Sequence, residues 1–218
     1  MAIQIQGTNG VVADVGGTGF RSIKVQQMPV EVGSLGAYRK SLLSGTMAAG
    51  LAANSEIFQF RWTDATRICL VRKILLNGLA GSATAFAAGF SKVDLVVARS
   101  WTVDGAGGTS GTLTGNNSKM RTSFGTTLLG SIRIASTAAL TIGTKTLDTD
   151  PVGLCSFSIG TTANVTYVQN WDLLGEDVGP EHPLVLTQNE GFILRATVPA
   201  TGTWQFGVTV IWSEVASY

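Results

Sequence analysis

Apolar and polar residues alternate with a period of two over the last part of the chain. In TGTWQFGVTVIWSEVASY (201–218) the large apolar side chains occupy every second position, at Trp204, Phe206, Val208, Val210 and Trp212. Successive side chains of a β-strand point to opposite faces, so this spacing predicts a strand with one apolar face. From Thr203 to Val215 it would span roughly 40 Å. We expect a central strand with Trp204 and Trp212 on the core face or at a subunit contact.

Similar patterns predict strands through most of residues 55–198. EIFQFRW (56–62) alternates, and RICLVRKILL (67–76) is apolar on both sides, as in the interior of a β-sandwich. Further strands are predicted in SKVDLVVARSWTV (91–103), GSIRIAS (130–136), LCSFSI (154–159), PLVLT (183–187) and GFILRATV (191–198). In RICLVRKILL, strict alternation places Ile68, Leu70 and Arg72 on one face and Cys69, Val71 and Lys73 on the other.

Glycine, proline and threonine mark the connections. PATG (199–202) has the residues of a tight turn, so we expect 191–198 and 203–215 to pair as an antiparallel hairpin. DGAGGTSGTLTGNNSK (104–119) has no apolar period and is predicted to be a long surface loop. Many strands and no convincing long amphipathic helix indicate an all-β protein, a jelly-roll-like antiparallel β-sandwich.

The first 50 residues differ from the rest. They contain short apolar pieces between glycines and serines, with one segment (19–32) that suits a β-hairpin and another (41–54) that suits a short helix or an ordered arm. We therefore expect an N-terminal arm or extension over residues 1–50 and a sandwich domain over residues 51–218. This arm would pack on its own domain or reach to a neighbouring subunit.

Composition adds a hint about partners. Only 13% of the 218 residues are charged, against about 25% in an ordinary soluble domain, and the mean hydropathy is +0.28. Either large surfaces are buried against partner proteins, or the strands of a two-layer β protein account for the apolar excess. The net charge of +1 does not favour direct contact with nucleic acid.

No apolar run approaches the roughly 20 residues of a membrane-spanning helix, and no signal peptide is recognised, so we expect folding in a reducing cytoplasm.

Residues suited to catalysis or metal binding are few. His182 is the single histidine, and Cys69 and Cys155 are too far apart in sequence for a metal-ligand motif. We expect both cysteines to be buried free thiols, with a disulfide between them as the alternative. Asp104 and the acids of TLDTDP (146–151) suit either calcium or turn capping. The sequence therefore predicts no catalytic residue, no cofactor-binding residue and no metal site, and no enzymatic activity.

Five arginines lie in or beside predicted strands. Such side chains commonly pair with carboxylates across subunits or fix loops through paired hydrogen bonds, although a groove for a polyanion is the rival interpretation. They are Arg61, Arg99, Arg121, Arg133 and Arg195.

The string VVADVGGTGFRSIKV (11–25) suggests a different function. It resembles the first phosphate loop of sugar kinases with the actin-like fold, in which Asp14, Gly16, Gly17 and Thr18 would cradle a nucleotide. That fold needs two α/β lobes and a second phosphate loop, which a β-rich chain of this length does not provide. The alternative is a β-hairpin whose glycines form the turn. A nucleotide-dependent sugar kinase therefore stays a remote alternative.

Several longer strings carry a stronger likeness. ANSEIFQFRWTD, VARSWT, GGTSGTLTGNNSKMRTSFGT, IRIASTAALTIGTKTLD and HPLVLTQNEGFILRATVPATGTWQFGVTVIWSEV together resemble uncharacterised structural proteins of tailed bacteriophages, from about residue 41 to the end. The resemblance implies a virion component with a jelly-roll-type fold, assembled in the host cytoplasm. It also implies a homotrimeric decoration, or cement, protein that binds the major capsid protein and has no catalytic residues. A glycan-binding or host-attachment jelly roll of the virion is the alternative.

Overall fold

The computed structural model describes residues 4–6, 12–14, 35–48, 50–81, 89–159, 166–175 and 183–216. The chain divides into two compact units, Met1–Glu31 and Val32–Tyr218. In the first unit, β1 (Gln4–Gln6) and β2 (Val12–Asp14) form an antiparallel pair. The segment 19–32, in which we expected a hairpin, lies outside the described residues.

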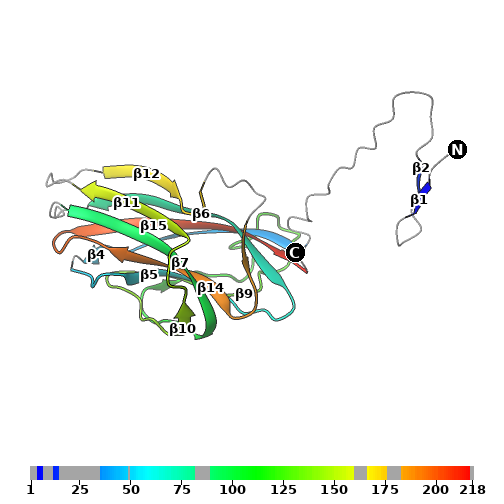
Figure 1. Ribbon diagram of the computed structural model, residues 1–218, viewed down its shortest axis with the longest axis horizontal. Coiled ribbons are helices and arrows are strands. Elements are labelled where there is room, and N and C mark those ends of the chain that lie inside the picture. Colours follow the sequence, from blue (N-terminus) through cyan, green and yellow to red (C-terminus); the bar gives the residue numbers. More distant parts are fainter. Residues whose placement is uncertain are drawn as a thin grey trace, which may run out of the picture. The chain divides into compact units, whose positions relative to one another are not determined.

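The second unit contains two antiparallel sheets, and all of the regular structure in its described residues is β (Figure 1). The first sheet consists of β3 (Gly36–Leu43), β4 (Met47–Ala48), β6 (Ile68–Gly81), β12 (Thr166–Asp172), β13 (Leu184–Leu186) and β15 (Thr203–Val215). The second consists of β5 (Ser55–Trp62), β7 (Gly89–Val103), β8 (Thr109–Ser110), β9 (Leu129–Ile134), β10 (Thr144–Leu147), β11 (Gly153–Ile159) and β14 (Glu190–Thr197). The predicted all-β, two-sheet architecture is confirmed.

The longer strands pair in a nested order. β3 pairs with β15, β5 with β14, β6 with β12 and β7 with β11, each antiparallel. In the first sheet this gives the order β12-β6-β15-β3, and in the second it places β11 on β7, which continues through β14 to β5. Early strands therefore pair with late ones, as if one long hairpin had been folded over into two sheets.

The strand that ends the described chain follows its pattern closely. β15 spans Thr203–Val215 and lies between β6 and β3, so it is the central strand that the alternation predicted. Trp204, Phe206, Val208, Val210 and Trp212 are all buried in the core between the sheets. The expected hairpin, however, is wrong, because β14 is already paired on both edges, with β5 and β7. The turn at 199–202 therefore carries the chain from one sheet to the other.

A β-bulge changes the faces of β6. The pairing of β15 with β6 steps from Ile211↔Lys73 to Trp212↔Val71, which leaves Arg72 as an extra residue. An extra residue reverses the alternation. Cys69 and Val71, before the bulge, and Ile74 and Leu76, after it, therefore all face the core. Strict alternation had placed Lys73 with Cys69 and Val71, and that expectation is wrong.

The boundary of the sandwich also differs from the expected one. We expected residues 1–50 to form an arm, but β3 and β4 lie within that range and both pair with β15. Residues 41–43 continue β3, and they are neither a short helix nor an arm. The amphipathic strand GAYRKSLL buries Tyr38, whose ring stacks on Trp212 with 5.6 Å between centroids. The division between the two units lies at Glu31 and Val32.

Candidate functional site

One segment joins the edges of the two sheets. β8 pairs with β9 in the second sheet, and Gly111 N donates to Ile132 O at 2.8 Å just beyond it. At its other end, Arg39 N donates to Ser118 O at 2.7 Å and Met120 N to Ala37 O at 3.0 Å, so this end pairs with β3 of the first sheet. The predicted loop 104–119 is therefore a strap that closes one side of the sandwich. Most of its side chains are exposed.

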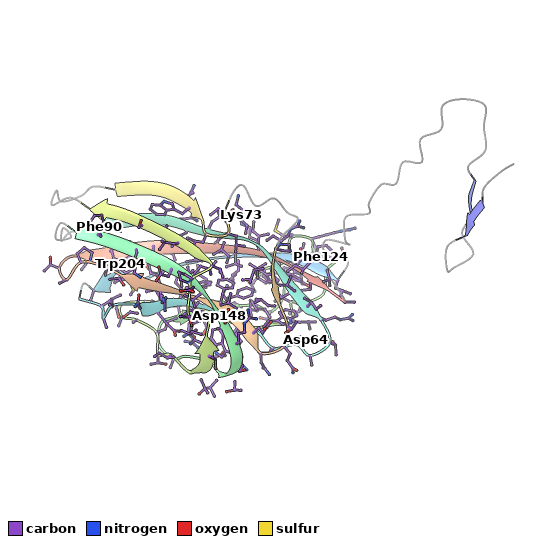
Figure 2. The ribbon with its side chains drawn as sticks, in the orientation of Figure 1. Asp64, Lys73, Phe90, Phe124, Asp148 and Trp204 are labelled. Atoms are coloured by element: carbon purple, nitrogen blue, oxygen red, sulfur yellow. The ribbon has the colours of Figure 1, made fainter. Side chains whose placement is uncertain are left out.

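Apolar side chains are exposed on the opposite edge of the second sheet. Phe90 of β7, which is labelled in Figure 2, is 84% exposed, and Leu154 of β11 is 59% exposed. Leu154 lies opposite Asp94, four pairs along from Phe90 on the same face, and Val152 is exposed just before β11. We call Phe90, Val152 and Leu154 the β11 edge patch. Strand β11 pairs with β7 in the described residues, which leaves its other side as an edge.

A second buried cluster covers the outward face of the same sheet. Val96, Ala98, Trp101 and Ile193 are fully buried there, with Leu147 packed against them. The covering segments attach to the sheet through backbone hydrogen bonds, from Leu140 N to Glu56 O and from Asp148 N to Val97 O. The second sheet is therefore buried on both faces over part of its area.

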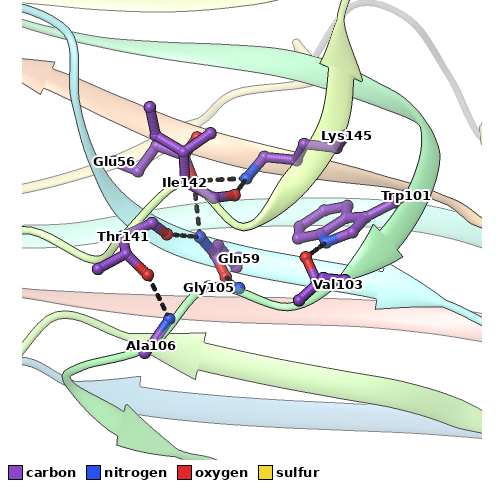
Figure 3. A network of polar contacts seen from close by, with 9 residues as sticks. All are labelled: Glu56, Gln59, Trp101, Val103, Gly105, Ala106, Thr141, Ile142 and Lys145. Atoms are coloured by element: carbon purple, nitrogen blue, oxygen red, sulfur yellow. Dashed lines mark hydrogen bonds and ion pairs between the residues drawn. The ribbon is translucent and has the colours of Figure 1, made fainter.

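A polar network lies beside this cluster, under the same covering segments (Figure 3). Glu56 Oε2 accepts from Gln59 Nε2 at 2.6 Å and from Lys145 Nζ at 2.9 Å. The Lys145 ammonium lies 4.6 Å from the centroid of the Trp101 ring and also donates to Ile142 O. The Lys145 side chain has no exposed surface and that of Glu56 has 4%. Because removing a charge from water costs several kcal/mol per ion, this pair needs the hydrogen bonds around it.

Both polar atoms of the Gln59 side-chain amide form hydrogen bonds. Its Nε2 also donates to Thr141 O at 2.9 Å, while its Oε1 accepts from Gly105 N at 3.1 Å. Glycine is required at position 105, since a Cβ there would come within 2.4 Å of Gln59 Nε2 and 1.9 Å of Thr141 O. By contrast, Glu56 Oε1 is buried and has no hydrogen-bond partner.

A bulge in β5 creates this network. The pairing with β14 steps from Phe58↔Leu194 to Glu56↔Arg195, so Ile57 is an extra residue. Residues three apart in a regular strand face opposite sides, but an inserted residue brings them to one side. Glu56 and Gln59 therefore share the outward face, whereas Phe58 and Phe60 enter the core. The sequence gives a partial signal, a glutamine between two phenylalanines, but nothing in it locates the bulge or the distant Lys145.

Four of the five arginines are paired within the chain. Arg61 Nη1 lies 3.1 Å from Asp104 Oδ1, and Arg195 Nε lies 3.2 Å from Asp94 Oδ2. Arg99 contacts both Asp148 and Glu190, and Arg133 donates to Gly107 O at 2.6 Å. The contacts of Arg61, Arg99 and Arg133 fix loops, one of the roles that we expected, whereas Arg195 and Asp94 join the paired strands β14 and β7. Arg121 is exposed.

The other candidates are placed as follows. Asp14 ends β2, whereas Gly16, Gly17, Thr18 and His182 lie outside the described residues. Asp104 and Asp148 form ion pairs with Arg61 and Arg99. Within the described ranges, no group of three or more His, Cys, Asp or Glu residues could hold a metal ion. Cys69 and Cys155 are both buried and free, as expected. In the part of the chain that the structure describes, no helix has the length and hydropathy to cross a membrane.

A buried carboxyl lies at the end of β15. Glu214 Oε1 accepts from Thr127 Oγ1 at 2.5 Å, Leu128 N at 3.0 Å and Trp212 Nε1 at 3.5 Å. Burial raises its pKa above the ordinary value, and these hydrogen bonds oppose the change only in part. Burial, with the nearby Glu214 charge, also raises the pKa of Tyr38 to about 12. The cluster ties residues 127–129 to the first sheet.

No family model, no curated protein and no solved structure matches the chain.

Proposed function

We propose that the protein is a non-enzymatic structural component of a virion, with a jelly-roll fold, that decorates the capsid and stabilises it by bridging capsid subunits. The observation that carries this proposal is the nested pairing of eight strands, β3 with β15, β5 with β14, β6 with β12 and β7 with β11. A jelly roll is an eight-stranded double sheet of this kind, and it recurs in viral capsid and lectin domains.

The surface also suits a protein that binds other proteins. In the part of the chain that the structure describes, the exposed Phe90, Val152 and Leu154 lie in or beside β7 and β11, where β11 leaves a strand edge, and exposed apolar residues among polar ones commonly mark protein contacts. The major capsid protein and further copies of this chain, as a homotrimer, are the partners that we propose. Such a protein stabilises its particle by mass action and needs no chemistry.

The glycan-binding alternative predicts an exposed aromatic platform. Among the described side chains, Phe90 is the strongly exposed aromatic residue, whereas Trp62, Trp101, Trp204 and Trp212 are completely buried. The remote kinase alternative needs two α/β lobes, and residues 32–218 contain two antiparallel sheets instead. The decoration role is therefore the one that we propose.

The test is co-sedimentation of the purified protein with phage heads that lack it, together with light scattering of the free protein. We expect saturable binding and a trimeric mass. Variant Phe90→Ser/Leu154→Ser should bind heads more weakly, and Arg121→Ser, an exposed change outside the patch, is the matched control. A second variant without residues 1–31 tests the N-terminal unit, because this deletion removes none of the strands of the two sheets. Absence of binding by the intact protein would reject the decoration role.

A further inference from the structure

Glu56 brings a lysine amine and a glutamine amide together in a buried site. A lysine amine and a glutamine amide both bind the same carboxylate oxygen, at 2.9 and 2.6 Å. Two atoms that share one acceptor lie within a few ångströms of each other. The Lys145 side chain is completely buried, and Gln59 is 1% exposed, so solvent has little access to either group. We infer that Lys145 and Gln59 form an intramolecular isopeptide bond, with Glu56 as the general acid and base.

The amine is the nucleophile. A lysine reacts as its neutral amine, so Lys145 must first lose a proton. The transfer of one proton from Lys145 Nζ to Glu56 Oε2, along the existing 2.9 Å contact, gives a neutral amine and a carboxylic acid. The Trp101 ring, 4.6 Å from Nζ, closes one side of the amine.

The amide is prepared for attack at its carbon. Gly105 N donates to Gln59 Oε1 at 3.1 Å, where negative charge develops when Nζ bonds to Cδ. A fixed backbone N–H in a buried site is an effective partner for such an oxyanion. The absence of a side chain at Gly105 is what allows this approach, as the clash of a Cβ with Gln59 shows.

The same carboxyl then serves the leaving group. Glu56 Oε2 lies 2.6 Å from Gln59 Nε2, so it can donate its proton to Nε2 and take the second proton from Nζ. The Cδ–Nζ bond forms, the Cδ–Nε2 bond breaks and ammonia leaves. Glu56 ends protonated, so one lysine charge and one carboxylate charge both disappear from a buried site, where each was costly. No oxidant, metal or other reactant is needed.

The bond would staple a covering segment to the sheet. Gln59 lies in β5, while Lys145 lies in β10 and follows the segment that covers the outward face. In the second sheet, β10 and β5 are separated by β7 and β14. The cross-link would therefore cross two strands and close a long loop of the chain. This inference does not depend on the proposed role in a virion.

Intact-mass spectrometry of the full-length protein decides the question. Loss of ammonia lowers the mass by about 17 Da relative to the sequence, and a protease digest should contain one branched peptide that joins Lys145 to Gln59. Lys145→Arg and Glu56→Gln should each restore the mass expected from their sequences. Lys92→Arg is the matched control, because Lys92 also pairs with a buried carboxylate at 2.9 Å, that of Asp94, whose Oδ2 is shared with Arg195 and not with an amide. That variant should keep the deficit.

Two results would overturn the inference. One is a wild-type mass equal to that of the sequence, with Lys145 and Gln59 both recovered in unmodified peptides. The other is a loss of about 18 Da that maps to Lys145 and Glu56, which would make Glu56 the acyl donor. Because both are measured on the wild-type protein, neither depends on whether a variant folds.

Discussion

The rings of Phe60 and Trp212 meet edge to face with 5.4 Å between their centroids, and this contact joins β5 of the second sheet to β15 of the first. Phe60 also stacks on Phe192 at 4.8 Å, and Trp212 on Tyr38 at 5.6 Å. A continuous aromatic row therefore crosses the sandwich from β14 to β3. Aromatic pairs add about 0.5–1.5 kcal/mol beyond the area that they bury.

Truncating this row should be costly. We expect Phe60→Ala to lower the free energy of unfolding by about 3–5 kcal/mol, because it leaves a cavity and removes two ring contacts. Phe90→Ala deletes the same atoms from a side chain that is 84% exposed, and should change stability by no more than about 0.5 kcal/mol. Denaturant unfolding of the two variants measures both values. Similar losses in the two would contradict the assignment of Phe60 to the core.

The buried Glu214 should make stability fall with rising pH. Burial raises its pKa in the folded state above the ordinary value of 4.5, so in the window just above 4.5 the folded protein holds a proton that the unfolded chain has lost. Stability then decreases as the pH rises through that window. Glu214→Gln keeps an acceptor for Thr127 and Leu128 but cannot ionise. Relative to this variant, the wild type should lose stability between pH 4 and pH 7 in denaturant titrations.

Glu190 provides the opposite sign. Burial would raise its pKa, but hydrogen bonds from Thr187 and Arg99 outweigh burial and hold the pKa below 4.5. Its contribution is therefore present above pH 4.5 and is lost as the pH falls through the folded-state pKa. Compared with Glu190→Gln, the wild type should become more stable with rising pH. If both pairs of curves had the same slope, the assignment of Glu214 as the raised group would fail.

The strap that joins the two sheets depends on backbone conformations that favour glycine. Gly108 has φ of +59°, and a Cβ there would lie 2.1 Å from Ile134 O. Gly108→Ala should therefore cost about 1–3 kcal/mol or more, because the strain adds to the clash. Gly125→Ala is the matched control, since a Cβ at Gly125 meets nothing within 4 Å. Thermal unfolding should show a lower midpoint for the first variant and little change for the second.

Alternation predicted the fold class because, in a β-sandwich, one face of each strand packs into the core and the other does not. It gave the bounds of β15 and its core face correctly, since this strand keeps a strict period over its apolar residues. It failed at Arg72, where a bulge shifts the period by one residue, and it did not locate the second bulge at Ile57. Local sequence does not specify a bulge, because the extra residue is accommodated by the partner strand.

The sequence also did not predict which residues distant along the chain come into contact. The turn at 199–202 has the residues of a hairpin, yet which sheet a strand joins is decided by the edges still free, and β14 had none. The Glu56–Lys145 pair spans 89 positions. Neither residue has a local motif, and their contact depends on the covering segment between β9 and β10, for which the alternation predicted no element beyond residue 136.

The two thiols should be protected to different degrees. Burial raises the pKa of Cys155 to about 11, and it raises that of the completely buried Cys69 well above the ordinary value of 9.0. Because the thiolate is the reactive form, a rise of two units lowers the reactive fraction of Cys155 at pH 8 by about 100-fold. With a disulfide reagent, we expect slow labelling of the native protein at pH 8 and faster labelling of Cys155 as the pH rises toward 11. Cys69 should react only on unfolding. Cys155→Ser should abolish the reaction of the native protein, and both thiols of the denatured wild type should react with the reagent. Rapid labelling of Cys69 in the native protein would contradict this prediction and would show that β6 opens away from β15.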